Sequence, residues 1–120
     1  MNVSLMSLVV AAADLESESS FWHQLLGGSV MRAETHHFLQ AEGFPVIVVQ
    51  HVPDHVPPQW PDGAPLHLHF DLATDDVAAA DELILHGGGR RLRPTDDVST
   101  QQGARVYASA AGHPFCVRSA

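Results

Sequence analysis

With 120 residues, the chain is long enough for one domain whose core needs neither disulfides nor metal ions to hold it together. Its 14 acidic residues outnumber six basic residues, and the net charge of −8 argues against nucleic acids and anionic membranes as partners. Cys116 is the single cysteine, which excludes an internal disulfide and predicts a cytoplasmic location. No apolar run approaches the ~20 residues of a membrane-spanning helix.

The first part of the chain predicts the element order β-α-β-β-β. An apolar run over residues 5–13 predicts a buried strand, and Asp14 can cap a helix that ends at the two glycines 27–28. Phe21 and Trp22 lie on the apolar stripe of this helix, and residues 16–20 are predicted to form its solvent-exposed side. Three short strands are then predicted over residues 29–34, 36–41 and 45–52.

The second part repeats this order after a proline-rich segment. Residues 53–65 predict a linker between a first unit of residues 1–52 and a second unit of residues 66–120, within a single domain. Asp75 or Asp76 can cap a helix that ends at the glycines 87–89. The strands of the second unit are predicted over residues 66–73, 90–93, 105–109 and 114–118.

The two units are offset by 62 residues, and this offset relates Asp14 to Asp76 and Ser7 to His69. Apolar and polar residues alternate strictly in the segment 66–72, so His67, His69 and Asp71 share one strand face. We expect this polar face to look into a wet cavity. The opposite faces of the two first strands are expected to pack against the helices with six apolar residues: Met6, Leu8, Val10, Leu68, Phe70 and Leu72.

Three segments carry a resemblance to a known family: residues 21–27 (FWHQLLG), 68–77 (LHFDLATDDV) and 111–117 (AGHPFCV). Together with the repeated units, they resemble the vicinal oxygen chelate superfamily of glyoxalases, bleomycin resistance proteins and dioxygenases, in particular its small actinobacterial glyoxalase-like branch. The resemblance implies an α+β fold in which two βαβββ units form a half-barrel-like mixed sheet around a cavity, with the helices on the outer face.

The same resemblance implies where a divalent metal would be held, and these positions fall on Ser7, Gln50, His69 and Cys116. Metal-dependent members have two His or Gln and two Glu ligands, whereas this chain offers one strong donor, His69, with an amide, a hydroxyl and a thiol. We therefore expect a degenerate metal site and predict no metal ligand. The cofactor is left open.

Each of these residues has a structural and a functional interpretation. We expect His69 to contact a ligand in the cavity, while His67 belongs either to the same site or to its polar rim. Gln50 is expected to hydrogen-bond inside the cavity, as is Ser7, and Cys116 to pack against the cavity floor. The histidines without a convergent spacing are expected at surface or rim positions: His36, His37, His51 and His55.

Three functions are compatible with this pattern, and the third of them is a subunit or regulatory partner that uses the fold only as an interaction surface. The first is a small-molecule-binding protein of the glyoxalase and bleomycin-resistance type that sequesters a planar or cationic compound. The second is a divalent-metal-dependent lyase, isomerase or dioxygenase of the same superfamily, in which the ion polarises substrate oxygens. Whether the protein is an enzyme is left open by the sequence. The resemblance also implies a homodimer, because a half-barrel leaves sheet edges that need cover.

Overall fold

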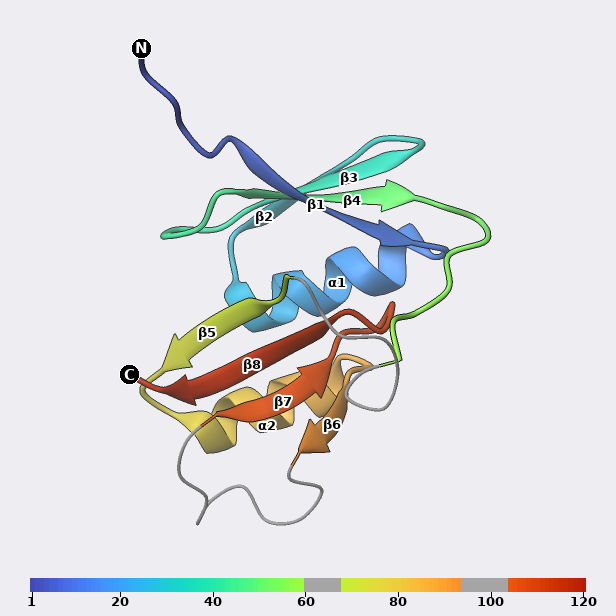
Figure 1. The fold of residues 1–120 in the computed structure, drawn as a ribbon. Coiled ribbons are helices and arrows are strands. Elements are labelled where there is room, and N and C mark those ends of the chain that lie inside the picture. Colours follow the sequence, from blue (N-terminus) through green and yellow to red (C-terminus); the bar gives the residue numbers. More distant parts are fainter. Residues whose placement is uncertain (60–67, 94–103) are drawn as a thin grey trace. The chain divides into compact units, whose positions relative to one another are not determined.

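The computed structural model describes residues 1–59, 68–93 and 104–120 (Figure 1). The chain divides into two units, Met1–His55 and Val56–Ala120. Residues 60–65 of the predicted linker and the predicted site residue His67 lie outside the described residues.

The first unit contains one helix and one four-stranded sheet. Its elements are β1 (Ser7–Ala12), α1 (Leu15–Leu26), β2 (Ser29–Arg32), β3 (His36–Gln40) and β4 (Val46–His51). The strand order across the sheet is β1-β4-β3-β2, in which β1 is parallel to β4 and the other pairs are antiparallel. The helix follows β1 directly and lies along one face of this sheet (Figure 1).

The second unit has the same topology. Its elements are β5 (Phe70–Thr74), α2 (Val77–His86), β6 (Arg90–Arg93), β7 (Arg105–Ala108) and β8 (Pro114–Ser119). The strand order is β5-β8-β7-β6, with β5 parallel to β8. The prediction of an α+β fold built from two βαβββ units is thus confirmed.

The predicted repeat includes the hydrogen bonds that cap the N-termini of the two helices. Asp14 Oδ1 accepts from the backbone N–H of Ser17 at 3.1 Å, and Asp76 Oδ1 accepts from that of Ala79 at 3.0 Å. Asp14 and Asp76 are 62 residues apart, and so are Ser17 and Ala79. The two helices are therefore capped in the same way. Gly27 caps the end of α1 by donating its N–H to the carbonyl of His23, and the next residue, Gly28, has a φ of 83° and leaves no room for a Cβ against the backbone of Gln40.

The core of the first unit lies between α1 and its sheet. Phe21 and Trp22 are both about 1% exposed, and their rings meet edge to face with centroids 5.0 Å apart. Trp22 Nε1 donates a hydrogen bond to Glu18 Oε2 at 2.9 Å. Glu18 and Ser19 are fully buried, so the expectation that residues 16–20 form the exposed side of the helix is wrong for these two. Their side chains are accommodated because each finds a polar partner inside.

The core of the second unit is organised by a buried carboxylate. Asp81 of α2 accepts two hydrogen bonds from Arg91, at 2.8 and 2.7 Å, and one from the Tyr107 hydroxyl at 2.8 Å. The Tyr107 ring stacks on Phe115 with centroids 5.7 Å apart. Burial and the neighbouring carboxylate raise the pKa of Tyr107, which keeps the hydroxyl protonated as a donor. The network ties α2 to both β6 and β7.

The first strand of each unit starts later than predicted. Met6 is 83% exposed and Leu68 is 91% exposed, because both precede the first residue of their strand. The expectation that these two side chains pack against the helices is therefore wrong. Leu8, Val10, Phe70 and Leu72 are partly buried within the strands. Neither helix of the described chain has the length and apolar character needed to cross a membrane.

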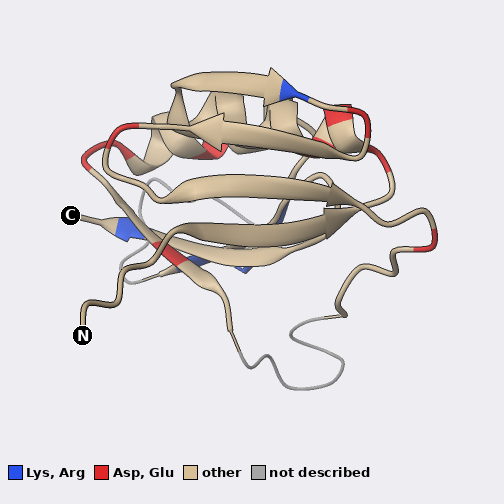
Figure 2. Ribbon diagram, turned by 90° about the horizontal axis from the view of Figure 1, so that it is seen from above, with Lys and Arg blue, Asp and Glu red and all other residues tan. Residues whose placement is uncertain are grey.

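Charged residues lie mainly at the ends of elements and in the connections, as Figure 2 shows for the backbone positions. The buried Asp81 is an exception, and its pKa is lowered chiefly by the hydrogen bonds from Arg91, with a smaller contribution from Tyr107. A lowered pKa means that the folded state binds the proton less tightly than the unfolded state. The stabilisation is therefore present above the ordinary value of 3.8 and is lost as pH falls through the lower folded value.

We expect Asp81→Asn to reduce the free energy of unfolding by ~1–3 kcal/mol at pH 7, because a charge-assisted network is replaced by neutral hydrogen bonds. The difference from the wild type should shrink as the pH falls below about 3.8, because the carboxylate of the unfolded wild-type chain is protonated there before that of the folded chain. Urea unfolding at pH 7 and pH 3 measures both values, with the exposed Glu82→Gln on the same helix as the control. A difference that stays constant with pH would contradict this account.

Candidate functional site

The register of the strands assigns each side chain in the first sheet to one of two faces. His37 of β3 is hydrogen-bonded to α1, and its register partner Val49 therefore shares the helix-covered face. Gln50 follows Val49 in β4 and lies on the opposite, helix-free face. Ser7 pairs with Val46, which has the parity of Gln50, so both predicted site residues of this unit lie on the helix-free face.

Ser7 and Gln50 are nevertheless separated along the sheet. Ser7 is the first residue of β1, whereas Gln50 is paired with Ala11 near the end of the same strand. Four residues of extended chain span roughly 13 Å at ~3.3 Å per residue. The two side chains can contact one extended organic ligand, but they cannot both coordinate one metal ion, because metal–ligand bonds are only ~2.0–2.6 Å long.

A histidine that the sequence did not single out lies directly beside Gln50. His36 of β3 is its cross-strand partner, and its ring stacks on Phe38 with centroids 6.2 Å apart and an interplanar angle of 24°. His36 Nδ1 is also 2.8 Å from the Thr35 hydroxyl. The expectation of a rim position for His36 thus misses its pairing with Gln50. The helix-free face as a whole carries Ser7, Val9, Ala11, Ser29, Met31, His36, Phe38, Gln40, Val46, Val48 and Gln50.

Cys116 lies on the helix-free face of the second sheet, because its register partner Asp71 alternates with the more buried Phe70 and Leu72. The thiol is buried, with 6% of the residue exposed. Burial raises the pKa of Cys116, and the carboxylate of Asp71 adds to this shift. A thiol whose pKa is raised is a poor nucleophile and a poor metal ligand at neutral pH. The interpretation of Cys116 as a packing residue is consistent with this environment.

Asp71 itself is engaged by an arginine on the same face. Arg118 Nε donates to Asp71 Oδ1 at 2.9 Å, and each side chain is about half exposed. His69 lies just before the first residue of β5 and is exposed. The helix-free face of this sheet therefore presents a cation and an anion held together beside a neutral thiol.

The internal repeat relates positions in β4 to positions in β8. Val9 and Asp71 are 62 residues apart, like the two helix caps, and they pair with Val48 and Cys116 respectively. Val48 is thus the counterpart of Cys116, and by the same register the counterpart of Gln50 is Arg118.

These donors do not fit a resident divalent ion. The counterpart of Cys116 is the hydrocarbon side chain of Val48, and the Arg118 guanidinium repels a cation near Cys116. The Asp71 carboxylate already accepts the hydrogen bond from Arg118. Within residues 1–59, 68–93 and 104–120, no group of three or more His, Cys, Asp or Glu side chains could hold a metal ion.

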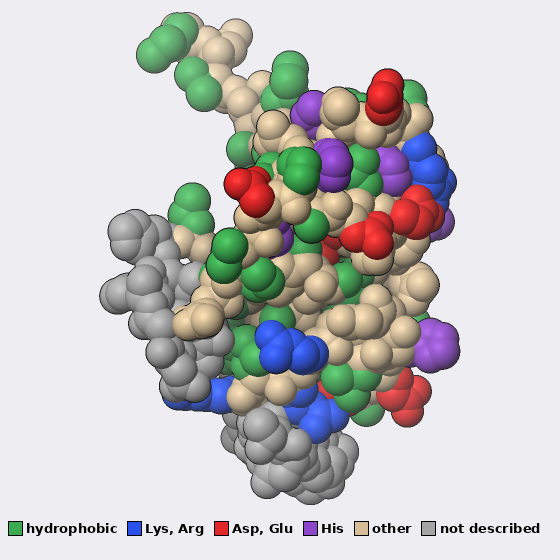
Figure 3. Space-filling view, turned by 90° about the vertical axis from the view of Figure 1, so that its right-hand side faces the viewer, with side chains coloured by type: hydrophobic (Ala, Val, Ile, Leu, Met, Phe, Trp, Pro, Cys, Tyr) green, Lys and Arg blue, Asp and Glu red, His purple; other side chains and the backbone are tan. Residues whose placement is uncertain are grey.

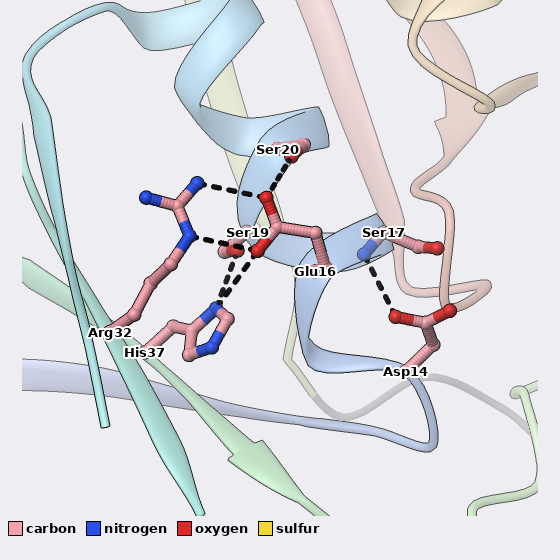
Figure 4. A network of polar contacts seen from close by, with 7 residues as sticks. All are labelled: Asp14, Glu16, Ser17, Ser19, Ser20, Arg32 and His37. Carbon is pink, nitrogen blue, oxygen red and sulfur yellow. Dashed lines mark hydrogen bonds and ion pairs between the residues drawn. The ribbon is translucent and has the colours of Figure 1, made fainter. Parts of the chain in front are cut away.

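A second polar cluster lies on the helix-covered side of the first unit. Histidine and acidic side chains are close together there, in the part of the surface that carries the N-terminus (Figure 3). Glu16 of α1 accepts two hydrogen bonds from Arg32, at 2.8 and 2.9 Å, and one from the Ser20 hydroxyl at 3.2 Å (Figure 4). The pKa of Glu16 is lowered to about 2, chiefly because Arg32 donates hydrogen bonds to its carboxylate.

His37 is part of this cluster and is only 7% exposed. Its Nδ1 lies 2.8 Å from Ser19 Oγ and 3.8 Å from Glu16 Oε2 (Figure 4). The expectation of a surface position for His37 is wrong. A signal for its burial was present in the sequence, because His37 has the same strand parity as Leu39, which is 1% exposed. The partner on the helix, Ser19, has no such signal.

The comparisons with known proteins agree with the architecture described above. A family model described as a glyoxalase-like domain matches residues 7–118. No curated protein matches the chain.

Solved structures with the same fold have low sequence identity to this chain. A glyoxalase-related enzyme from Fulvimarina pelagi is 20% identical with a TM-score of 0.70, covering 98% of this chain and 88% of that one. The fosfomycin resistance protein FosX from Listeria monocytogenes is 13% identical with a TM-score of 0.72, covering 100% and 95%. A glyoxalase/bleomycin resistance protein/dioxygenase family enzyme from Burkholderia phytofirmans PsJN is 14% identical with a TM-score of 0.69, covering 98% of both chains.

At these identities the solved structures establish the fold alone, whereas the family model spans nearly the whole sequence. The predicted superfamily is confirmed: this chain belongs to the glyoxalase-like family, with the two-unit fold of the glyoxalase, bleomycin resistance and dioxygenase superfamily.

Proposed function

We propose that this protein binds a small organic molecule on the helix-free faces of its sheets, without a resident divalent metal. The observation that carries the proposal is Arg118, which stands on the face where the resemblance implies a metal and is paired with Asp71 there. A guanidinium in this place opposes a divalent cation but can donate hydrogen bonds to a ligand.

The helix-free face of the first sheet has the composition of a ligand-binding surface. Gln50 and His36 supply neighbouring hydrogen-bonding groups at one end. Phe38 and Val48 are direct strand partners and form an apolar patch beside them, and Val9, on the far side of Val48, is 58% exposed. Small-molecule sites combine a mainly apolar lining with a few polar groups that fix orientation.

The predicted convergence of Ser7, Gln50, His69 and Cys116 in one cavity remains part of this proposal, with His67 as a further ligand contact. His69 would supply a hydrogen bond from its imidazole, and Cys116 a small apolar contact. We further propose a cytoplasmic location, because the sole cysteine is reduced and buried.

The class of ligand is a planar or cationic compound, and related proteins suggest two probes. The structural neighbours include a fosfomycin resistance protein and an enzyme of the glyoxalase/bleomycin resistance protein/dioxygenase family. Bleomycin is the first probe because it is large and partly planar, whereas fosfomycin is small. One neighbouring FosX structure is described as a complex with Mn(II), so Mn²⁺ is the natural test of the alternative, a metal-dependent enzyme.

We expect bleomycin to raise the melting temperature of the untagged protein, because a ligand that binds only the folded state stabilises it. His69→Ala should weaken this binding by about tenfold, as for the loss of one hydrogen bond to a charged or polar group. Thermal shift and isothermal titration calorimetry measure the two effects. Prior treatment with a chelator should leave the melting temperature unchanged.

His86→Ala is the matched control, because it removes an exposed histidine at the end of α2. Three results would count against the proposal: no stabilisation by either probe, equal loss of binding in both histidine variants, or stoichiometric manganese, iron, nickel or zinc that leaves on chelation together with ligand binding. The last result would establish the metal-dependent alternative.

The shared cavity is tested by a double-mutant cycle between the two units. If Gln50 and His69 contact the same ligand, the binding losses in Gln50→Ala, His69→Ala and the double variant should be non-additive by at least ~0.5 kcal/mol. Calorimetric titration with the same probe gives all three values. Strictly additive losses would mean that the two faces act independently.

We also propose a homodimer, since an isolated half-barrel leaves sheet edges without partners. Light scattering coupled to size-exclusion chromatography at micromolar concentration should give twice the 12.9 kDa mass of the chain. A monomeric mass that persists as the concentration is raised tenfold would refute this part of the proposal.

A further inference from the structure

The first unit contains an open pocket on the helix-covered side of its sheet, away from the helix-free face. Its volume is about 470 Å³, and all of its lining residues belong to this unit. The pocket lies where β1 leads into α1, beside the connection from β2 to β3 and the end of β4. The lining residues are Ala13, Asp14, Leu15, Glu16, Glu34, His37 and His51.

His37 is the buried polar side chain that lines this pocket, with 9% of its side chain exposed. Its Nδ1 is held by Ser19 and faces Glu16, and its other ring nitrogen, Nε2, points away from both (Figure 4). No described residue hydrogen-bonds Nε2. A buried imidazole fixed at one nitrogen thus leaves the second nitrogen for a partner from outside the chain.

The groups around Nδ1 determine what Nε2 can do. Glu16 is ionised at neutral pH, since its pKa is lowered to about 2, and a carboxylate can only accept hydrogen bonds. The Ser19 hydroxyl can donate to Nδ1 or accept from it, and we assign the proton to Nδ1 because the Glu16 carboxylate lies 3.8 Å from that nitrogen. In that tautomer Nε2 carries a lone pair and accepts a hydrogen bond, so the partner of His37 is a donor.

The charges of the pocket select the kind of donor. Glu16 is neutralised by Arg32, and Asp14 Oδ1 is occupied by the N-cap hydrogen bond from Ser17. Glu34 is exposed and makes no ion pair with a described residue. With Asp14, Glu16 and Glu34 against one arginine, the pocket has a net negative charge. It therefore attracts a positively charged group.

The side chains of this pocket do not form a metal-binding site. The described acidic and histidine side chains include no set of three that could hold a metal ion. An organic cation with N–H groups satisfies both features, because one N–H can donate to His37 Nε2 while the positive charge is balanced by Glu34.

We infer that this pocket is a second binding site, for a small organic cation that carries N–H donors, such as an alkylammonium or guanidinium group, with His37 Nε2 as the acceptor and Glu34 as the counter-charge. The site is independent of the helix-free faces proposed above.

The inference is tested by titrating the untagged protein with methylguanidinium and n-propylammonium, followed by long-range ¹H–¹⁵N spectra of the histidine rings. We expect His37 to be the Nδ1–H tautomer before titration and its Nε2 resonance to shift on saturation. Tetramethylammonium has the same charge but no N–H, and should bind at least about tenfold more weakly. Raising the salt concentration should weaken binding of all three cations.

Two variants separate the roles of the residues. His37→Asn keeps an amide near the position of Nδ1 but lacks the acceptor at Nε2, so the affinity for methylguanidinium should fall about tenfold. Glu34 is exposed in the connection between β2 and β3, so its replacement should not disturb the fold. Glu34→Gln should reduce the affinity for methylguanidinium about threefold to fivefold. Glu42→Gln is the matched control, since it removes an exposed acid outside the pocket lining and should leave the affinity unchanged.

Several outcomes would overturn the inference. They are no shift of the His37 resonances with either N–H cation, equal affinity for tetramethylammonium, or equal loss of affinity in Glu34→Gln and Glu42→Gln. Saturable binding of Mn²⁺ or Zn²⁺ with shifts at His37 would replace the organic cation by a metal and would also refute it.

Discussion

The parallel pairing of the first and last strand in each unit is the constraint on which the rest of the structure depends. A parallel pair requires a crossover, and each unit uses its helix for it, which leaves one face of the sheet covered and the other free. Strand parity then decides the role of every side chain. In β4, Val49 goes to the core and Gln50 to the free face, because adjacent residues point in opposite directions.

Arginine pairing is the second organising feature, because in each case it determines what a carboxylate can still do. Arg91 holds Asp81 inside the second unit, where the pair joins helix to sheet. Arg118 occupies Asp71 on the free face, and so removes both a carboxylate donor and a favourable environment for a metal ion. Arg32 occupies Glu16, which leaves that carboxylate able to orient His37 while contributing little free charge to the neighbouring pocket.

These pairs bear on metal binding in a member of the glyoxalase-like family whose described residues include no group of three or more His, Cys, Asp or Glu side chains that could hold a metal ion. The fold supplies two sheets with free faces, and the chemistry depends on a few positions on them. Here the register pairs Val48 with Val9 and Cys116 with Asp71. The free faces that carry the predicted site therefore present two valine side chains in the first unit, and a buried thiol beside an ion pair in the second. On the free face of the first sheet, His36 is the cross-strand partner of Gln50, so two side chains that can hydrogen-bond are adjacent there.

The sequence by itself determined the element order, the repeat and the helix caps, because these depend on local periodicity and on hydrogen bonds within three residues, as at Asp14 and Asp76. It also predicted the free-face positions of Ser7 and Gln50, since parity is a local property. Met6 and Leu68 were misplaced because strand ends depend on where a partner strand stops. The burial of Glu18 and Ser19 was decided by tertiary structure: a polar side chain is buried only where another residue supplies its hydrogen bond, and the pattern of apolar and polar residues along the helix does not show that partner.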